Sequence, residues 1–510
     1  MKDHEADLFV EFLEKQGGKA AQVQATHISY LFFQGDRVYK AKKTLKTDFL
    51  DYSSVALRHK HCVAELRLNQ RLAPQVYLSV KAVYSDKQYG FSWTENGEVC
   101  DWVVEMVCLP SHRMLDELIS RAKVNSSDLD PLAVLLSRFY QSQKVTIADM
   151  DSFWMKLYQH CKDNFAALPT DGFSDEMIEK IQLIKAAQSS FLFTNYHTFI
   201  ARKNFIVDGH GDLRPEHICL TNPPIVFDCV EFSSAYRITD ILDDLSFFGL
   251  ECIAFGKQDL SDYLYKQIPE LGDYPLNLFA FYLSYRAMVR VKVESIKALQ
   301  DSKSSLDACK RYLDVGFKQA ILIKKPILIV VGGLSGSGKT TVSSLISKML
   351  SAKHLQSDEL RFDLFKQKDM GSGEFNKGRY LPELRDVVYR KLVRRAKQLL
   401  RQGCSVVIDA SFIDLHHRNL IKTMLMNNPK LSSSGIWCVC SDEVAIRRLT
   451  HRRMGQNGYS EAGPDIYWHQ KNQLEKIDKD DVFRHRIDTN LDIKSLELRL
   501  LSMLRKQLSV

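Results

Sequence analysis

Residue types suited to handling phosphate groups gather in two stretches of this 510-residue chain. The first reads Gly333-Leu334-Ser335-Gly336-Ser337-Gly338-Lys339-Thr340-Thr341, which fits the pattern Gly-x-x-x-x-Gly-Lys-Thr. Glycines let the backbone curl so that several N–H groups point at a phosphate, and a helix start adds partial positive charge. The apolar run 327–331 and the amphipathic run 342–350 supply the strand and helix that such a loop requires. Lys339 is therefore expected to reach the β- and γ-phosphates of a nucleotide, and Thr340 to bind Mg²⁺.

The same part of the chain offers candidates for an acceptor site. Asp358 closes an expected strand and Arg361 follows one helical turn later, so both should lie at the carboxyl end of the sheet, where ligands bind in open α/β folds. Asp358 is a candidate general base and Arg361 a candidate grip on the acceptor; a helix-capping aspartate with an exposed arginine is the alternative. Asp409 ends the next expected strand and is a candidate Mg²⁺ ligand.

A basic helix then precedes a Gly/Ser-rich segment over 455–463. Arg448 and Arg452 share one face of that helix, at i and i+4. We expect them to act as lid arginines that close over the phosphates. The alternative is a solvated basic helix face.

The second stretch is the loop over residues 208–231, in which two short apolar segments each present an acid. Asp212 lies in Gly209-His210-Gly211-Asp212, and Asp228 ends the run 225–228. Phosphoryl transfer to a hydroxyl needs one carboxylate to orient or deprotonate the nucleophile and a second to hold Mg²⁺. Asp212 and Asp228 have the types and the spacing for these roles.

This loop resembles the catalytic loop of the aminoglycoside phosphotransferase and choline kinase branch of the protein-kinase-like fold, which runs His-Gly-Asp-x-x-x-x-Asn. The resemblance implies that Asp212 is the catalytic base, that Asp228 and position 217 hold the metal, and that Lys40 and Glu65 form a phosphate-positioning ion pair. His217 stands where the family has asparagine, and magnesium prefers oxygen ligands to imidazole. Two solvated surface charges are the alternative for Lys40 and Glu65.

The last part resembles the small P-loop kinases grouped with gluconate kinase, the zeta-toxin-like kinases and the polynucleotide 5′-hydroxyl kinase domain. The order of the two parts resembles the bifunctional aminoglycoside phosphotransferase/ATP-binding proteins of bacteria. Together these resemblances imply ATP and Mg²⁺ as cofactors.

The elements that must position these residues indicate two domains of mixed α/β and α+β class. Residues 1–322 are expected to form a bilobal kinase-like domain, with an N-lobe over 1–108 and a C-lobe over 109–322. Residues 323–510 are expected to form a P-loop domain, a three-layer α/β/α fold around a parallel sheet. Lys324-Lys325-Pro326 marks the junction, because proline cannot continue a helix. A long helical stretch is expected over 174–204, leading into the loop over 208–231.

Composition sets limits on the class of protein. The 70 Lys+Arg against 62 Asp+Glu give a formal charge of +8, which is mild for this length and does not argue for nucleic acid. The polar start and the lack of a long apolar run predict neither a signal peptide nor a membrane span. The 11 scattered cysteines lack paired metal-type spacing, which predicts reduced thiols in a cytoplasmic protein.

We therefore expect an ATP-dependent phosphotransferase whose P-loop domain moves the γ-phosphate of ATP to a hydroxyl of a small molecule. The kinase-like domain is either a second small-molecule kinase, with drug modification as one possible role, or a ligand-binding module. Two alternatives stay open for the P-loop domain: a nucleotide-driven regulatory switch without an acceptor, and a polynucleotide 5′-hydroxyl kinase. The acceptor, the oligomeric state and the coupling of the two domains are not predicted.

Overall fold

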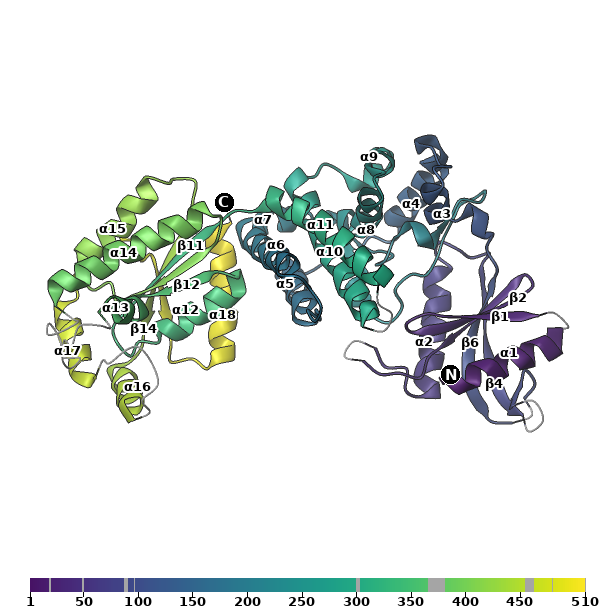
Figure 1. Cartoon of the computed structure of the whole chain (residues 1–510), viewed down its shortest axis with the longest axis horizontal. Coiled ribbons are helices and arrows are strands. Elements are labelled where there is room, and N and C mark those ends of the chain that lie inside the picture. Colours follow the sequence, from purple (N-terminus) through teal and green to yellow (C-terminus); the bar gives the residue numbers. More distant parts are fainter. Residues whose placement is uncertain are drawn as a thin grey trace. The chain divides into compact units, whose positions relative to one another are not determined.

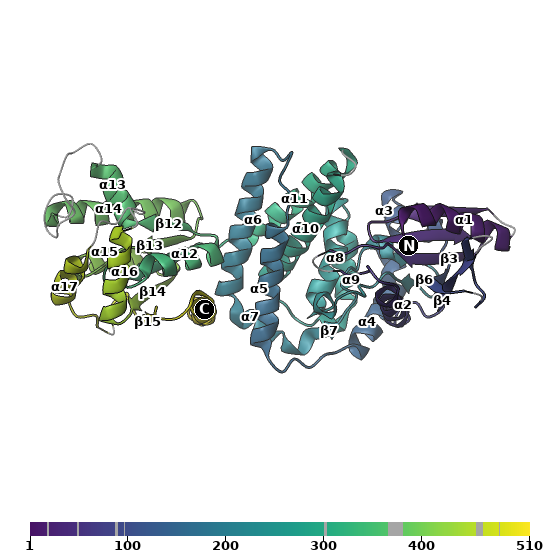
Figure 2. The same ribbon diagram turned by 90° about the horizontal axis from the view of Figure 1, so that it is seen from below.

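A computed structural model describes residues 1–17, 20–47, 50–86, 90–95, 97–299, 303–365, 381–454, 463–478 and 480–509. By packing, the chain divides into two compact units, Met1–Lys156 with Arg202–Ala287 and Leu157–Ala201 with Met288–Val510. Two of the three dividing points fall inside helices, so this division does not test where a separately folding domain ends. The expected boundary at 322/323 stays a prediction. Figures 1 and 2 show the elements of both units.

The first unit begins with an antiparallel six-stranded sheet in the order β1-β2-β3-β6-β4-β5, in which β4 and β6 contain register shifts. Helix α1 packs on one face of this sheet and helix α2 on the other. The bounds of these elements are α1 Asp3–Gly17, β1 Ala21–Ala25, β2 Ser29–Gln34, β3 Arg37–Lys42, α2 Val55–Asn69, β4 Tyr77–Asp86, β5 Gly90–Ser92 and β6 Val99–Val107.

Alternation along β3 explains how this sheet can position charges. Tyr39 and Ala41 belong to the apolar cluster under α1, whereas Val38 belongs to the cluster under α2. Because successive side chains of a strand point to opposite faces, Lys40 and Lys42 lie on the α2 face with Val38.

The rest of this unit is helical, with short hairpins that carry the loop over residues 208–231. Its elements are α3 Leu115–Ser120, α4 Asp130–Ser142, β7 Ile206–Asp208, β8 Ile218–Cys219, β9 Ile225–Val226, β10 Ile238–Asp240, α8 Ile241–Ala254 and α9 Gln258–Lys266. Helices α5 Met150–Ala166 and α10 Leu276–Ala298 begin in this unit and end in the second. Strand β7 pairs with β10, and β8 pairs with β9. The expected bilobal kinase-like arrangement is confirmed.

The second unit is built on a five-stranded parallel sheet in the order β12-β13-β11-β14-β15. Helices α14 and α15 cover one face, and α12 and α18 the other, as Figure 1 shows, so the expected three-layer fold is confirmed. The elements of this unit are α6 Asp175–Thr194, α7 Tyr196–Ala201, α11 Lys303–Ile323, β11 Ile327–Gly332, α12 Lys339–Leu350, β12 Lys353–Gln356, α13 Ser357–Phe365, α14 Pro382–Arg401, β13 Val406–Asp409, α15 Leu415–Met426, β14 Ser432–Val439, α16 Asp442–Met454, α17 Pro464–Gln473, β15 His485–Asp488 and α18 Ile493–Leu508.

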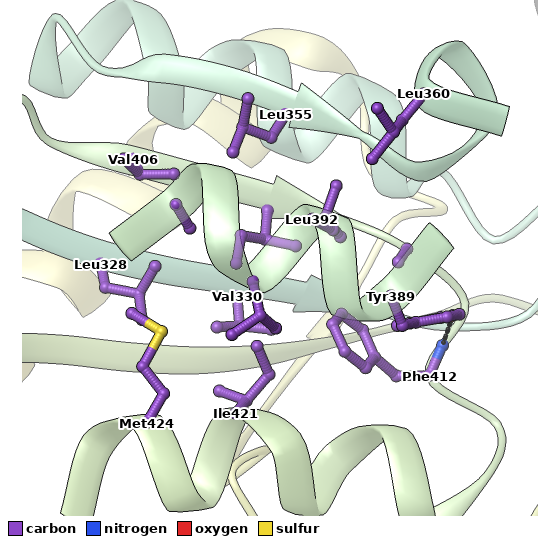
Figure 3. Close-up of a cluster of buried hydrophobic side chains, with 14 of the residues drawn as sticks. Leu328, Val330, Leu355, Leu360, Tyr389, Leu392, Val406, Phe412, Ile421 and Met424 are labelled. Carbon is purple, nitrogen blue, oxygen red and sulfur yellow. Dashed lines mark hydrogen bonds between the residues drawn. The ribbon is translucent and has the colours of Figure 1, made fainter. Parts of the chain in front are cut away.

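An apolar core joins this sheet to α14 and α15. Val330 and Val406 of the strands meet Leu392 of α14 and Ile421 of α15 (Figure 3). Every residue of β11 is buried, which is typical of a central parallel strand covered on both faces. This core fixes the position of the strand ends next to which the phosphate loop begins.

The expected helical stretch over 174–204 is present as two helices, α6 and α7. It is interrupted at Asn195, which ends α6 and whose side-chain amide donates to the Phe191 carbonyl at 3.1 Å.

Within the described ranges, no helix combines the length and the apolar character needed to cross a bilayer.

Candidate functional site

The phosphate loop has the backbone that its glycines predict. Gly336 and Gly338 have φ angles of 78° and 83°, in the left-handed region that favours glycine. A Cβ atom on Gly336 would lie 2.6 Å from the Ala445 carbonyl oxygen. The space within the loop therefore stays open because glycine has no side chain. Gly338 directly precedes α12, so the first turn of this helix begins behind the loop.

Lys339, Thr340 and Asp409 line one cleft with the loop. The register of β11 and β13 pairs Val331 with Asp409, which brings this acid beside the point where the phosphate loop leaves the sheet. Asp409 is only 4% exposed. Among the described residues, the one basic side chain within 4 Å of this carboxylate is His354, whose Nε2 lies 3.5 Å from Oδ2. A buried carboxylate without a lysine or arginine partner, next to a phosphate cradle, fits a site for Mg²⁺ on a nucleotide.

The acceptor candidates Asp358 and Arg361 line the same cleft. Asp358 lies in the first turn of α13, not in the strand, and its carboxylate accepts a hydrogen bond from Arg361 three residues on. Sequence reasoning missed several cleft residues, among them two polar side chains from more distant helices. Arg385 of α14 lines the cleft, and Gln470 of α17 accepts a hydrogen bond from Ser335 N at 2.7 Å. Both belong to helices whose charged or polar composition gave no signal that one side chain turns inward.

Arg448 has a different environment from the one expected of a lid residue. Its guanidinium donates to the Thr489 carbonyl at 2.6 Å and to the Thr489 hydroxyl at 3.0 Å, and it also approaches the Gly336 carbonyl at 3.4 Å. It thus ties the end of β15 to the phosphate loop and is not among the cleft-lining residues. The side chain of Arg452 and residues 455–462 of the expected lid lie outside the described part of the chain, so the lid role stays a prediction.

In the first unit, Lys40 lies between two acids on the α2 face of the sheet. Its Nζ is 2.7 Å from Glu65 Oε1 and 2.5 Å from Asp228 Oδ1. Burial alone would raise the pKa of Asp228, but the ammonium of Lys40 and then His217 hold that pKa well below its ordinary range. Asp228 also has a φ of 62°, a conformation that costs a non-glycine residue about 1–3 kcal/mol and clusters at functional sites. The structure therefore brings these expected residues together.

Asp212 is held by a neighbour that the sequence pattern did not single out. Arg214 Nε and Nη2 donate to the two carboxylate oxygens of Asp212 at 2.9 and 3.0 Å. His217 Nδ1 lies 2.9 Å from the Asp212 carbonyl oxygen, while its Nε2 faces Asp228 Oδ2 at 3.5 Å. His217 therefore lies between the two acids, and both oxygens of Asp212 already carry a charge-assisted hydrogen bond.

One buried acid of α8, Asp244, supports the loop over residues 208–231. Asp244 accepts hydrogen bonds from the backbone N–H groups of His210 and Gly211, at 3.0 and 2.7 Å, and from the Tyr140 hydroxyl at 3.0 Å. Asp244 therefore holds the backbone of residues 210 and 211 in place.

Known proteins are similar to this chain over both of its expected domains. A family model described as an AAA domain matches residues 328–477. The uncharacterized protein Rv2004c of Mycobacterium tuberculosis is 30% identical over 403 residues, which cover 77% of this chain and 78% of that protein. The chain belongs to the family of this mycobacterial protein. Because 403 residues exceed the length of either expected domain, members of this family share parts of both.

Two more distant similarities concern one part each. The cytidylate kinase of Methanococcus aeolicus is 27% identical over 126 residues, or 25% of this chain and 64% of that enzyme. A crystal structure of a choline/ethanolamine kinase family protein from Mesorhizobium loti covers 63% of this chain and 94% of its own, with 13% identity and a TM-score of 0.38. The present chain therefore contains a P-loop kinase-like domain. This domain includes the phosphate loop, its parallel sheet and the residues that the family model matches.

Proposed function

We propose that the P-loop domain transfers the γ-phosphate of ATP to a hydroxyl group of a small molecule. The observation that carries the proposal is a single cleft that joins the phosphate loop to Asp358, Arg361 and Arg385. Phosphoryl transfer depends mainly on positioning and charge stabilisation, and this cleft combines a phosphate cradle with a carboxylate and two cations.

The residues divide by role according to where they lie. Lys339 and the N–H groups of the loop would bind the phosphates, and Thr340 with Asp409 would hold Mg²⁺, which neutralises phosphate charge when bound. Asp358 would orient the acceptor hydroxyl and take its proton. Arg361 keeps the Asp358 carboxylate in place and, with Arg385, would contact polar or anionic groups of the acceptor.

For the kinase-like domain we propose ligand binding without phosphoryl transfer. The bidentate hydrogen bonds of Arg214 engage both oxygens of Asp212, and the position expected to supply an amide oxygen for magnesium holds the imidazole of His217. Lys40 and Asp228 would still bind an anionic ligand and its counter-ion.

We also propose that the protein works in the cytoplasm, where its eleven cysteines, none of which forms a disulfide, would remain thiols.

A labelled-ATP transfer assay of the full chain against metabolite pools tests the first proposal. Lys339→Ala should abolish both ATP affinity and transfer. Asp358→Asn should leave ATP affinity unchanged and lower transfer by about 10²–10⁴-fold, the range for loss of general base catalysis. ATP hydrolysis that needs no acceptor and is unaffected by Asp358→Asn would support the switch alternative instead. Transfer only to 5′ ends, with steep salt dependence, would support the polynucleotide alternative.

A further inference from the structure

Three side chains from two neighbouring helices of the P-loop domain gather away from the phosphate cradle. Asp386 lies on α14, and His416 and His417 lie in the first turn of α15. One oxygen of Asp386, Oδ1, lies 3.0 Å from His416 Nε2 and 3.8 Å from His417 Nε2. The ligand atoms of all three residues lie within 4.8 Å of one another.

The shorter separation is also that of a hydrogen bond, but both separations together fit ligands of one metal ion. Ligand atoms about 2.1 Å from a tetrahedral Zn²⁺ lie about 3.4 Å from each other, and the two measured distances bracket that value. The distance of 3.8 Å from His417 Nε2 to Asp386 is too long for a hydrogen bond. An exposed His416–Asp386 ion pair would account for the shorter contact alone, whereas a shared metal ion accounts for both.

The three groups are also held in orientation by their neighbours. His417 Nδ1 lies 3.1 Å from Asp414 Oδ2, so a proton on Nδ1 is bound by that carboxylate and the lone pair of Nε2 is left facing Asp386. Such a carboxylate behind a histidine is the usual support of a metal ligand. Arg390 Nε donates to the other oxygen of Asp386, Oδ2, at 2.6 Å, which turns Oδ1 toward the imidazoles.

We propose that Asp386, His416 and His417 form a binding site for a divalent transition metal ion of the Zn²⁺ type, with water completing the coordination. Two imidazoles and one carboxylate favour zinc and related metals over Mg²⁺, which prefers oxygen ligands. The site differs from the magnesium site proposed at Thr340 and Asp409, and it does not depend on the proposed phosphoryl transfer.

This metal site is connected to the cleft by two short chains of contacts. Asp414, which supports His417, also lies 3.3 Å from Arg385 Nη1 of the cleft. The ring of His417 stacks on Tyr389 at 4.0 Å, and the Tyr389 hydroxyl lies 3.2 Å from the hydroxyl of Ser411, another cleft residue. A metal ion at His417 would therefore fix the side of the cleft where the acceptor is expected.

Calorimetric titration of the full, metal-free chain with Zn²⁺ tests the site. His416→Ala and Asp386→Asn should each weaken binding at least about tenfold, because each removes one of three ligands. His416 is 59% exposed, so its removal should leave folding intact, which circular dichroism can verify. His451→Ala, at an exposed histidine of α16, is the matched control and should bind as the unmodified protein does.

Co²⁺ in place of Zn²⁺ identifies the ligand atoms, since thiolate ligands give an intense charge-transfer band that imidazole and carboxylate do not. The proposal expects visible d–d bands without that thiolate band, and their loss in His416→Ala. It is overturned if the unmodified chain binds no Zn²⁺, if the two ligand variants bind as tightly as the control, if Mg²⁺ competes equally, or if the Co²⁺ spectrum shows thiolate ligation.

Discussion

At the scale of single residues, the kinase-like domain concentrates its charge in one buried network. Lys40 and Lys42 both contact Glu65, and Lys42 also contacts Glu231. Lys42 and Glu65 are fully buried, so the folded state depends on their pairing. Removing one partner of a buried ion pair typically costs about 3–5 kcal/mol of stability. This excludes the alternative in which Lys40 and Glu65 are solvated surface charges, although it does not by itself assign them to phosphate binding.

His210 makes this loop sensitive to pH. Its Nε2 lies 2.8 Å from the Phe227 carbonyl oxygen and its Nδ1 accepts from Asp212 N, so both nitrogens are used by the neutral ring. Burial, followed by the nearby His217, lowers the pKa of His210. As the pH falls through about 6.5, the unfolded chain gains a proton at this residue while the folded chain does not. The stability due to neutral His210 is thus present above that pH and lost below it.

We therefore expect the free energy of unfolding to fall between pH 7.5 and pH 5.5, with a contribution from His210 of at most about 1.4 kcal/mol per pH unit. Urea denaturation at the two pH values measures this fall. His210→Gln, which keeps one donor and one acceptor, should reduce the fall, whereas His27→Gln, at an exposed site of the same unit, should not. An equal fall in the unmodified chain and in His210→Gln would show that other groups cause it.

At the scale of elements, the loop that follows β13 is fixed from two sides. Arg418 of α15 donates to the carbonyls of Phe412 and Ile413 at 3.0 and 2.9 Å, and to Asp481 Oδ2 at 2.8 Å. Tyr389 of α14 accepts from Phe412 N at 3.0 Å, the contact drawn in Figure 3. The end of β13, with Asp409, is held in place by these contacts.

Arg418→Met should destabilise the P-loop domain by about 3–5 kcal/mol, because it leaves Asp481 buried and unpaired and removes the donors to four backbone carbonyls. Thermal or chemical unfolding of the full chain measures this loss. Arg395→Met, at an exposed position of α14, should change stability by no more than about 0.5 kcal/mol. A loss of less than 1 kcal/mol in Arg418→Met would mean that the loop is not braced by this residue.

Much of the element order could be predicted because apolar periodicity and glycine spacing are local signals. The strand, loop and helix around Lys339 and the strand ending at Asp409 were found this way. The partner of Arg448 could not be, since a basic residue on a helix has the same sequence signal whether it reaches a ligand or the Thr489 carbonyl. The bidentate contact between Arg214 and Asp212 likewise depends on the rotamers of a loop, which residue types do not determine.

At the scale of the whole molecule, two candidate sites of different construction share one chain. In the P-loop domain, the side chain of the candidate base Asp358 is 34% exposed and is paired with Arg361. In the kinase-like domain, the candidate base Asp212 is paired bidentately with Arg214 and lies beside His217. The difference predicts that the two parts contribute unequally to any phosphoryl transfer.

Transfer from labelled ATP should therefore be lost in Lys339→Ala and retained within about twofold in Asp212→Ala. The reason is that Asp212 would have to release Arg214 before it could accept a proton, and a charge-assisted bidentate pair in a partly buried site resists that release. Both variants are compared in the same full chain with the same metabolite pool, with nucleotide affinity measured beside transfer. If Asp212→Ala abolishes transfer and Lys339→Ala does not, the kinase-like domain is the catalyst, and the bond between Arg214 and Asp212 opens when its substrate binds.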